Sequence, residues 1–174
     1  KKQAMLRIKI LSMGDAAVGK SCIIKRYCEE RFVSKYISTI GIDYGVKPTT
    51  INQRDVRVNF WDMSGQDAFF EVRNEFYKDA SGAVLVYDVS NRTSFDNLQT
   101  WLDEARKYGA GNDIPIFVLA NKVDKRRTVM EAEGVAFASA NGLAHWETSA
   151  SSGANCSDAF EGLFREIMSR PPVG

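Results

Sequence analysis

Two kinds of hydrophobic pattern alternate along the chain. Short apolar or β-branched runs predict strands, and stretches with apolar residues at helical spacing predict helices between them. The continuous apolar run at 83–87 is typical of a parallel strand buried on both faces. The six predicted strands cover residues 6–11, 44–51, 56–62, 83–87, 114–120 and 143–147. The five predicted helices cover about 22–29, 69–78, 95–109, 129–141 and 160–168.

The order of these elements predicts the fold class. Residues 52–55 are turn-like and would join the second and third strands into an antiparallel hairpin. The other strands alternate with helices, which predicts a three-layer α/β fold. We therefore expect a six-stranded, mostly parallel sheet with one antiparallel strand and about five helices. A capping-box pattern at Thr128 and Glu131 predicts the start of the fourth helix, and Gly142 predicts its end.

Length, charge and hydropathy limit the possible functions. At 174 residues the chain can bury a proper core, and we expect a single domain over residues 1–174. The net charge of +1 gives no strong field that would favour nucleic acid or an anionic membrane surface. No apolar run approaches the roughly 20 residues of a membrane-spanning helix. We expect neither a nucleic-acid partner nor a transmembrane segment.

The cysteines and the single histidine do not form a metal-ligand pattern. Cys22, Cys28 and Cys156 are an odd set without C-x-x-C spacing, interpreted as free thiols of a reducing compartment. His145 has no Cys or His neighbour in the sequence, so packing or surface exposure is the simpler interpretation. These features favour a cytoplasmic protein.

A glycine-rich stretch lies between the first predicted strand and the first predicted helix. Its pattern is G-x-x-x-x-G-K-S, formed by Gly14, Asp15, Ala16, Ala17, Val18, Gly19, Lys20 and Ser21. The glycines let backbone N–H groups approach a phosphate at the helix N-terminus. Lys20 can reach the outer phosphates, and the Ser21 hydroxyl can ligate Mg²⁺. A chance match in an ordinary turn is the alternative, and the flanking strand and helix count against it.

The third predicted strand ends in a second group of candidate residues. Asp62 can hold a water of a Mg²⁺ shell from this position. Gly65 can offer its N–H to a γ-phosphate, and Gln66 can orient an attacking water. Asp62 alone would equally fit a turn-capping residue, but the Gly-Gln pair that follows favours the nucleotide interpretation.

Two later strand ends indicate guanine. The next-to-last strand is followed by Asn121, Lys122 and Asp124 in an N-K-x-D pattern. A carboxylate at Asp124 can accept hydrogen bonds from N1–H and the 2-amino group of guanine, and adenine offers neither donor. The backbone at Ser149 and Ala150 can read the guanine O6. Ligands of such sheets bind beyond the carboxyl ends of the strands, so the three motifs predict bound GTP or GDP with Mg²⁺.

These motifs resemble those of small GTPases of the Ras superfamily, and the resemblance covers nearly the whole chain. It implies the P-loop NTPase fold of a G domain and places Cys22 with the nucleotide-binding residues. The run 36–44 resembles the first switch of the Rab branch. This match implies that Thr39 is the second protein ligand of Mg²⁺, that Phe32 flanks the guanine ring, and that Tyr36 closes over the phosphates.

Longer runs resemble the RJL family, Rab-like GTPases that in some members carry a C-terminal J domain. Met63, where ordinary Rabs have threonine, fits this family as well. The runs are 22–29, 31–36, 43–47 and 71–79.

Hydrolysis is expected to be slow in the isolated chain. The resemblance implies that Lys20 and Gln66 are the catalytic residues, and no arginine precedes the switch threonine to act as an internal finger. Ala16, Ala17 and Ser64 depart from the family pattern. Side chains at the two alanines would lie near the γ-phosphate, so we expect nucleotide binding to survive and assisted hydrolysis to be weakened.

Partners follow from the same resemblance. Effector proteins would bind the switch loops at an aromatic triad of Tyr44, Trp61 and Phe76, for which core or sheet packing is the alternative role. An exchange factor and an activating protein are also implied, and we expect a monomer. Because no cysteine follows Cys156, we expect no prenylation site in this chain. Because it begins without methionine, it is also compatible with excision from a longer protein, and the family alone implies nuclear or ciliary association.

Three functions are compatible with these features. The leading one is a guanine-nucleotide switch that hydrolyses GTP slowly. The second is an interaction module that binds GTP with little or no hydrolysis. The third is a P-loop ATPase or kinase, which Asp124 argues against.

Overall fold

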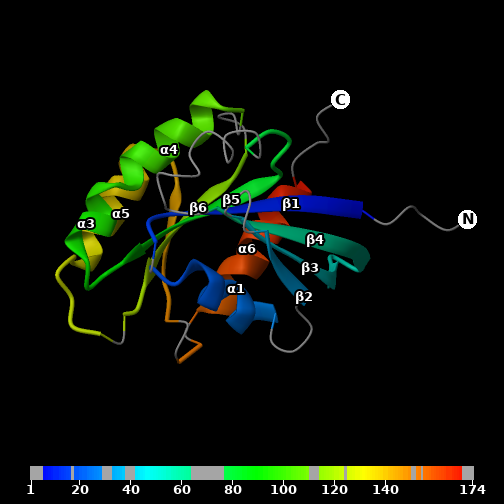
Figure 1. Cartoon of the computed structure of the whole chain (residues 1–174), viewed down its shortest axis with the longest axis horizontal. Coiled ribbons are helices and arrows are strands. Elements are labelled where there is room, and N and C mark those ends of the chain that lie inside the picture. The colour runs from blue at the N-terminus through cyan, green and yellow to red at the C-terminus, as the bar shows by residue number, and fades with distance from the viewer. Residues whose placement is uncertain are drawn as a thin grey trace, which may run out of the picture.

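One mixed sheet forms the centre of the molecule. The computed structural model describes residues 6–16, 18–28, 33–37, 42–63, 77–109, 114–123, 125–149, 152–153 and 155–169. Seven strands follow the order β2-β3-β4-β1-β5-β6-β7 (Figure 1). They are β1 Leu6–Met13, β2 Val33–Ile37, β3 Ile42–Ile51, β4 Arg54–Met63, β5 Gly82–Asp88, β6 Ile116–Asn121 and β7 Ala144–Glu147. β3 is antiparallel to β2 and β4, and the other neighbouring pairs are parallel.

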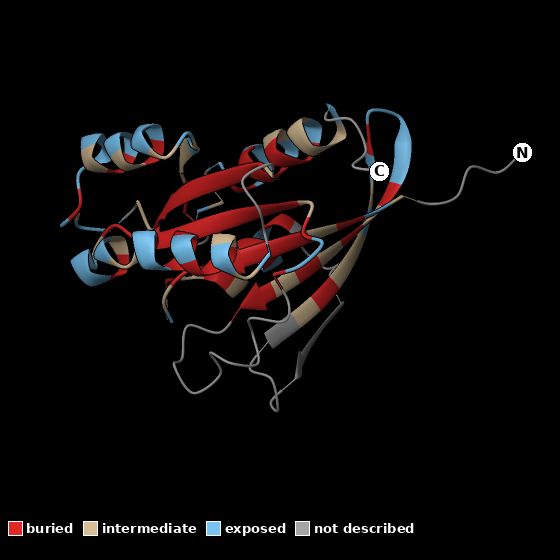
Figure 2. Ribbon diagram, turned by 90° about the horizontal axis from the view of Figure 1, so that it is seen from above, coloured by how far each residue is buried: buried red, intermediate tan, exposed pale blue. Residues whose placement is uncertain are grey.

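Helices cover both faces of this sheet. Within the described residues they are α1 Lys20–Cys28, α3 Arg92–Asp96, α4 Leu98–Lys107, α5 Glu131–Ala140 and α6 Cys156–Ser169. Residues of α1 and α6 form one hydrophobic core with β1 and β4, whereas α4 and α5 contribute to a second core on the opposite face. Figure 2 shows the buried strands between helices whose outer faces are exposed. The predicted three-layer α/β fold with one antiparallel strand is therefore confirmed.

The buried strands and the hairpin agree with the sequence pattern. Every residue of β5 and of β6 is buried, as the continuous apolar runs require. β3 and β4 form the predicted hairpin. Its two central residues, Asn52 and Gln53, have φ of 51° and 65°. Positive φ at both positions is the type I′ geometry that matches the twist of a two-residue hairpin.

The structure differs from the expected element list in two places. The strand count of six was one short, because β2 pairs with β3 from Val33–Val46 to Ile37–Ile42, in a segment to which no strand or helix was assigned from the sequence. The expected helix over 95–109 is divided into α3 and α4. Asn97 lies at the junction, where its backbone N–H donates to the carbonyl of Thr93 at 3.1 Å.

The predicted capping box of α5 was wrong by two residues. The N-cap is Met130, whose N–H donates to the Glu133 carboxylate at 2.9 Å. Thr128 lies outside the helix because its N–H and that of Val129 both donate to the carbonyl of Val89, at 2.8 and 3.0 Å. This attachment to the end of β5 delays the start of the helix.

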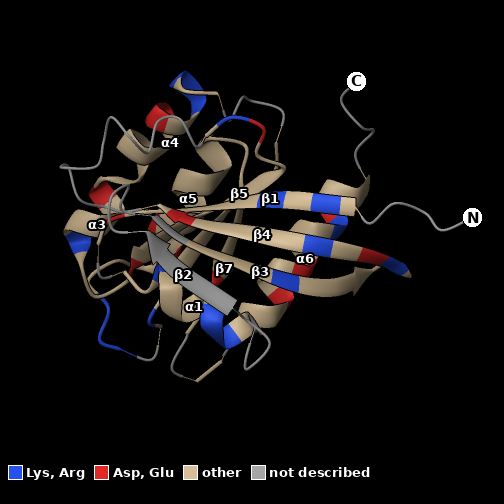
Figure 3. Cartoon of the chain, turned by 45° about the vertical axis from the view of Figure 1, so that its right-hand side comes forward, with Lys and Arg blue, Asp and Glu red and all other residues tan. Residues whose placement is uncertain are grey.

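The described structure shows mixed charges along its elements (Figure 3) and no helix suited to span a membrane. Basic and acidic residues both occur along its helices and strands (Figure 3). Among the helices of the described residues, none is long and apolar enough to cross a membrane.

Candidate functional site

The candidate residues lie at one edge of the sheet. β1, β4, β5, β6 and β7 are parallel to one another, so their carboxyl ends share this edge (Figure 1). Ligands of open α/β sheets bind at such an edge. The glycine-rich stretch follows β1, Asp62 is the next-to-last residue of β4, and Asn121 ends β6.

The glycines of the loop between β1 and α1 allow close contacts with other strand ends. A Cβ atom on Gly14 would lie 2.3 Å from the carbonyl oxygen of Val86 in β5. A Cβ atom on Gly19, whose φ is +96°, would lie 2.4 Å from the side-chain nitrogen of Asn121. Both contacts are too short for any other residue type. The loop is therefore held directly against β5 and β6.

The Lys20 ammonium is held within this loop. Lys20 begins α1 and is only 7% exposed. Its Nζ donates to the carbonyl oxygens of Gly14 and Asp15, each at 2.9 Å. This geometry places a positive charge within the loop, where it could bind an anion.

Ser21 and Asp62 form a direct pair across the edge. The Ser21 hydroxyl donates to the carboxylate of Asp62, which is buried at the end of β4. A hydroxyl next to a carboxylate is a donor set that fits Mg²⁺, which usually takes one or two carboxylates and completes its shell with water and phosphate oxygens. In the described part of the chain, no group of three or more His, Cys, Asp and Glu residues is placed to hold a metal by itself.

Asn121 links three segments of the site. Its side chain is fully buried, and its Nδ2 donates to the carbonyl of Val18 in the glycine-rich loop at 2.8 Å. Its Oδ1 accepts a hydrogen bond from the Thr148 hydroxyl at 3.3 Å. The end of β6 is thus joined to the phosphate-loop candidate on one side and to the segment after β7 on the other.

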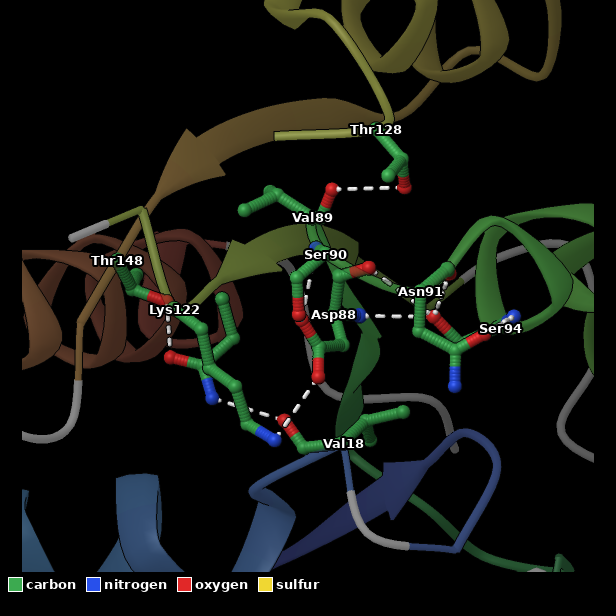
Figure 4. A network of polar contacts seen from close by, with 10 residues as sticks. Val18, Asp88, Val89, Ser90, Asn91, Ser94, Lys122, Thr128 and Thr148 are labelled. Atoms are coloured by element: carbon green, nitrogen blue, oxygen red, sulfur yellow. Dashed lines mark hydrogen bonds and ion pairs between the residues drawn. The ribbon is translucent and has the colours of Figure 1, made fainter. Parts of the chain in front are cut away.

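Lys122 pairs with a residue that the motif analysis missed. Its Nζ lies 2.9 Å from the Asp88 carboxylate at the end of β5 (Figure 4). Burial raises the pKa of Asp88, but hydrogen bonds from Lys122 and Ser90 outweigh burial and hold the pKa below its usual value. The position of Asp88 after an apolar strand, like that of Asp62, is the signal that could have indicated it.

The segment after β7 lies beside the end of β6. The Thr148 N–H donates to the carbonyl of Ala120 at 2.7 Å, and the Val123 N–H donates to the carbonyl of Thr148 at 3.3 Å. Ser149 is fully buried, and its hydroxyl accepts from the N–H of Ser152 at 3.2 Å. The two candidate base-reading segments are therefore adjacent in space.

Asp15 makes contacts that sequence reasoning also missed. Its carboxylate accepts hydrogen bonds from the Asn97 amide at 2.6 Å and from the Trp101 indole N–H at 2.9 Å. Both donors lie more than eighty residues away in the chain. No local pattern indicates such a contact.

The remaining predicted residues have different positions. Ala16 and Cys22 are exposed, and Val18 is buried. The rings of Tyr44 and Trp61, on the neighbouring strands β3 and β4, are in tilted contact with centroids 4.5 Å apart. For Tyr36, the structure describes only the backbone, as part of β2. Lying outside the described residues are Ala17, Phe32, Thr39, Ser64, Gly65, Gln66, Phe76, Asp124 and Ala150.

Comparison with known proteins identifies the class. The family model described as "Ras family" matches residues 9–169. The chain therefore belongs to the Ras family of small GTPases, and this membership indicates a GTP-binding switch.

Individual relatives make the assignment more specific. Proteins named "DnaJ homolog subfamily C member 27" are 51% identical over 169 residues in Bos taurus, 51% over 168 in Danio rerio and 50% over 169 in Homo sapiens. The matches cover 94%, 93% and 94% of this chain, respectively, and 62% of each relative. The chain thus spans less than two thirds of the length of these relatives. The predicted resemblance to the Rab-like RJL family is confirmed.

Proposed function

We propose that this chain is a guanine-nucleotide switch that binds GTP and GDP with Mg²⁺ and hydrolyses GTP slowly. The observation that carries the proposal is the direct contact between three motifs. Lys20 lies inside the glycine-rich loop, Ser21 pairs with Asp62, and Asn121 is bonded to Val18 of the same loop. The candidate phosphate loop, the candidate Mg²⁺ donor pair and the candidate base-reading motif thus lie in contact at one edge of the sheet, which supports the proposal.

The chain's own groups would act mainly by positioning. In the proposed mechanism, Lys20 exchanges its carbonyl partners for phosphate oxygens and stabilises charge that develops during phosphoryl transfer. Ser21, Asp62 and Thr39 would hold Mg²⁺, which supplies charge neutralisation on the phosphate oxygens when bound. Gln66 would orient the attacking water, and Asp124 would select guanine.

The proposed switch acts through the segments that carry Thr39 and Gly65. Contacts of these residues with a γ-phosphate would order both segments in the GTP state, and hydrolysis would release them. Tyr44 and Trp61, whose rings contact each other on β3 and β4, would then contribute to an effector surface. An exchange factor and an activating protein are proposed as further partners. By analogy with relatives named DnaJ homologs, we also propose that the domain acts within a larger cytoplasmic protein.

The test is to identify the nucleotide that co-purifies with the protein and to follow its hydrolysis under single-turnover conditions with excess protein. We expect guanine nucleotide, and a slow conversion of GTP to GDP that Gln66→Leu lowers without reducing GDP binding. Ala17→Gly should raise the rate, because it removes a side chain next to the proposed γ-phosphate position. Binding of ADP with no binding of GDP would contradict the proposal.

A second candidate is an interaction module that binds GTP with little or no hydrolysis. It is favoured by Ala16, whose side chain is exposed in the loop where crowding near the γ-phosphate is expected. The same single-turnover experiment separates the two candidates, because the second predicts no detectable GDP from GTP that remains bound.

A further inference from the structure

The carboxylate of Asp15 lies in a loop that is proposed to bind phosphate, where a negative charge is unfavourable. Like charges in a partly buried site repel strongly because water screens them poorly. Asp15 lies in the loop that leads to Lys20, and the Lys20 ammonium donates to the backbone carbonyl oxygen of Asp15 at 2.9 Å. Its carboxylate would therefore repel an incoming anion unless neighbouring groups hold it away from the proposed phosphate position.

Two donors on the α3–α4 unit direct it. The Asn97 amide donates to one carboxylate oxygen at 2.6 Å, and the Trp101 indole N–H donates to the other at 2.9 Å. Residues four apart on a helix lie on the same face, so both donors point to the same spot. Trp101 is only 5% exposed and belongs to the hydrophobic core, which limits its movement.

The break between α3 and α4 sets the position of the first donor, the Asn97 amide. Asn97 has φ of −84° and ψ of −5° at the junction of the two helices, and its carbonyl accepts from the Trp101 N–H at 3.2 Å. α3 is itself attached to the end of β5, since the Ser94 hydroxyl accepts from the Asp88 N–H at 2.9 Å (Figure 4). The two donors are thus fixed relative to the sheet edge.

We infer that Asn97 and Trp101 are positioning residues for the nucleotide, which act by holding the Asp15 carboxylate away from the phosphate position. The inference deepens the proposed nucleotide switch and rests on it. Because GTP carries one more phosphate than GDP, a released carboxylate should weaken GTP binding more than GDP binding. The α3–α4 unit would thereby set the preference between the two nucleotides.

The experiment exchanges the two polar groups. Asn97→Asp places a second carboxylate against Asp15, and like charges in direct contact are strongly disfavoured. We expect release of a fluorescent, non-hydrolysable GTP analogue to be about tenfold faster, with a smaller effect on fluorescent GDP. The double variant Asp15→Asn with Asn97→Asp restores an amide facing a carboxylate and leaves an oxygen for the Trp101 indole. Its release rates should return to within about twofold of the parent rates.

A matched control is available on the same helix. The amide of Gln99 donates to the carboxylate of Asp103 at 2.9 Å on the exposed surface of α4. Gln99→Glu introduces the same kind of carboxylate pair away from the site and should leave both release rates unchanged. Trp101→Phe retains an aromatic ring, removes the N–H donor, and should also speed GTP release more than GDP release.

Two results would overturn the inference while leaving the proposed function intact. One is a parent-like GTP release rate in Asn97→Asp, and the other is an equal loss in the single and double variants. If Asn97→Asp does not fold, the Trp101→Phe comparison decides, and equal effects on the two nucleotides would overturn the inference. A parent protein that binds no guanine nucleotide would overturn the proposed function as well.

Discussion

Replacement of Gly19 by alanine should separate backbone strain from the loss of a buried hydrogen bond. Gly19 has φ of +96°, which an L-residue adopts only with strain, and a Cβ there would lie 2.4 Å from Asn121 Nδ2. That nitrogen donates to Val18 at 2.8 Å, so the new methyl group would displace the amide from its acceptor. Gly142 has φ of +70°, and a Cβ added there would meet no atom within 4 Å, so its replacement would show strain alone.

The two expected magnitudes differ because of Asn121. Positive φ costs an alanine about 1–2 kcal/mol, which is the whole expected effect of Gly142→Ala. A buried donor or acceptor left without its partner costs a further ~1–3 kcal/mol, so Gly19→Ala should lower the free energy of unfolding by about 2–5 kcal/mol. A domain of this size is usually stable by only about 5–15 kcal/mol. The loss would therefore be conspicuous.

Urea unfolding of both nucleotide-free variants provides the assay, because a change in midpoint at constant m-value measures stability. The measurement is then repeated at saturating GDP, where a ligand that binds only the folded state adds stability. We expect Gly142→Ala to gain as much from GDP as the parent does, and Gly19→Ala to gain less. Equal destabilisation of the two glycine variants would refute the role assigned to the contact between Gly19 and Asn121.

Two further predictions concern the pH dependence of stability. The pKa of Asp88 lies below its usual value in the fold, so its contribution is present above the unfolded pKa of ~3.9 and is lost as the pH falls further. Asp88→Asn should lower the urea midpoint at pH 6 and reduce its decline between pH 5 and 3, and an unchanged decline would contradict the pairing with Lys122. Burial lowers the pKa of His145, and nearby carboxylates such as Glu147 offset this only in part. Stability linked to this group is complete above the unfolded pKa of ~6.5 and falls as the pH drops below it, so His145→Gln should give a flatter urea midpoint between pH 7.5 and 5.5, and a parent-like slope would exclude a neutral, partly buried imidazole.

Much of the fold could be predicted because its strongest patterns are local. The fully buried strands β5 and β6 are continuous apolar runs, and the β3–β4 hairpin has an alternating pattern around a short turn. β2 could not be predicted in the same way, since its pairing with β3 depends on an available sheet edge rather than on its own composition. The start of α5 was misplaced because tertiary hydrogen bonds to Val89 override the local capping pattern at Thr128.

In the candidate site, too, the residues with a local sequence pattern could be predicted and those that depend on tertiary contacts could not. Lys20, Asp62 and Asn121 could be proposed from motifs because each occupies a strand end or loop with a characteristic local pattern. The ion pair of Lys122 with Asp88 and the contact of Trp101 with Asp15 join segments that are distant in the chain. Their discovery requires the packed structure, because only tertiary contacts bring the partners together.

The register of the β3–β4 hairpin has a mechanical consequence for the proposed switch. Ile42 at the start of β3 pairs with Met63 at the end of β4. The segment that carries Thr39 therefore joins β3, and the segment that carries Gly65 follows β4, at the two members of this residue pair. A partner that displaces either segment would act on the same Ile42–Met63 pair, so the two segments should move together. Lengthening the tight turn at Asn52 and Gln53 by one residue would shift this register and separate the two attachment points, although the turn lies at the opposite end of the hairpin.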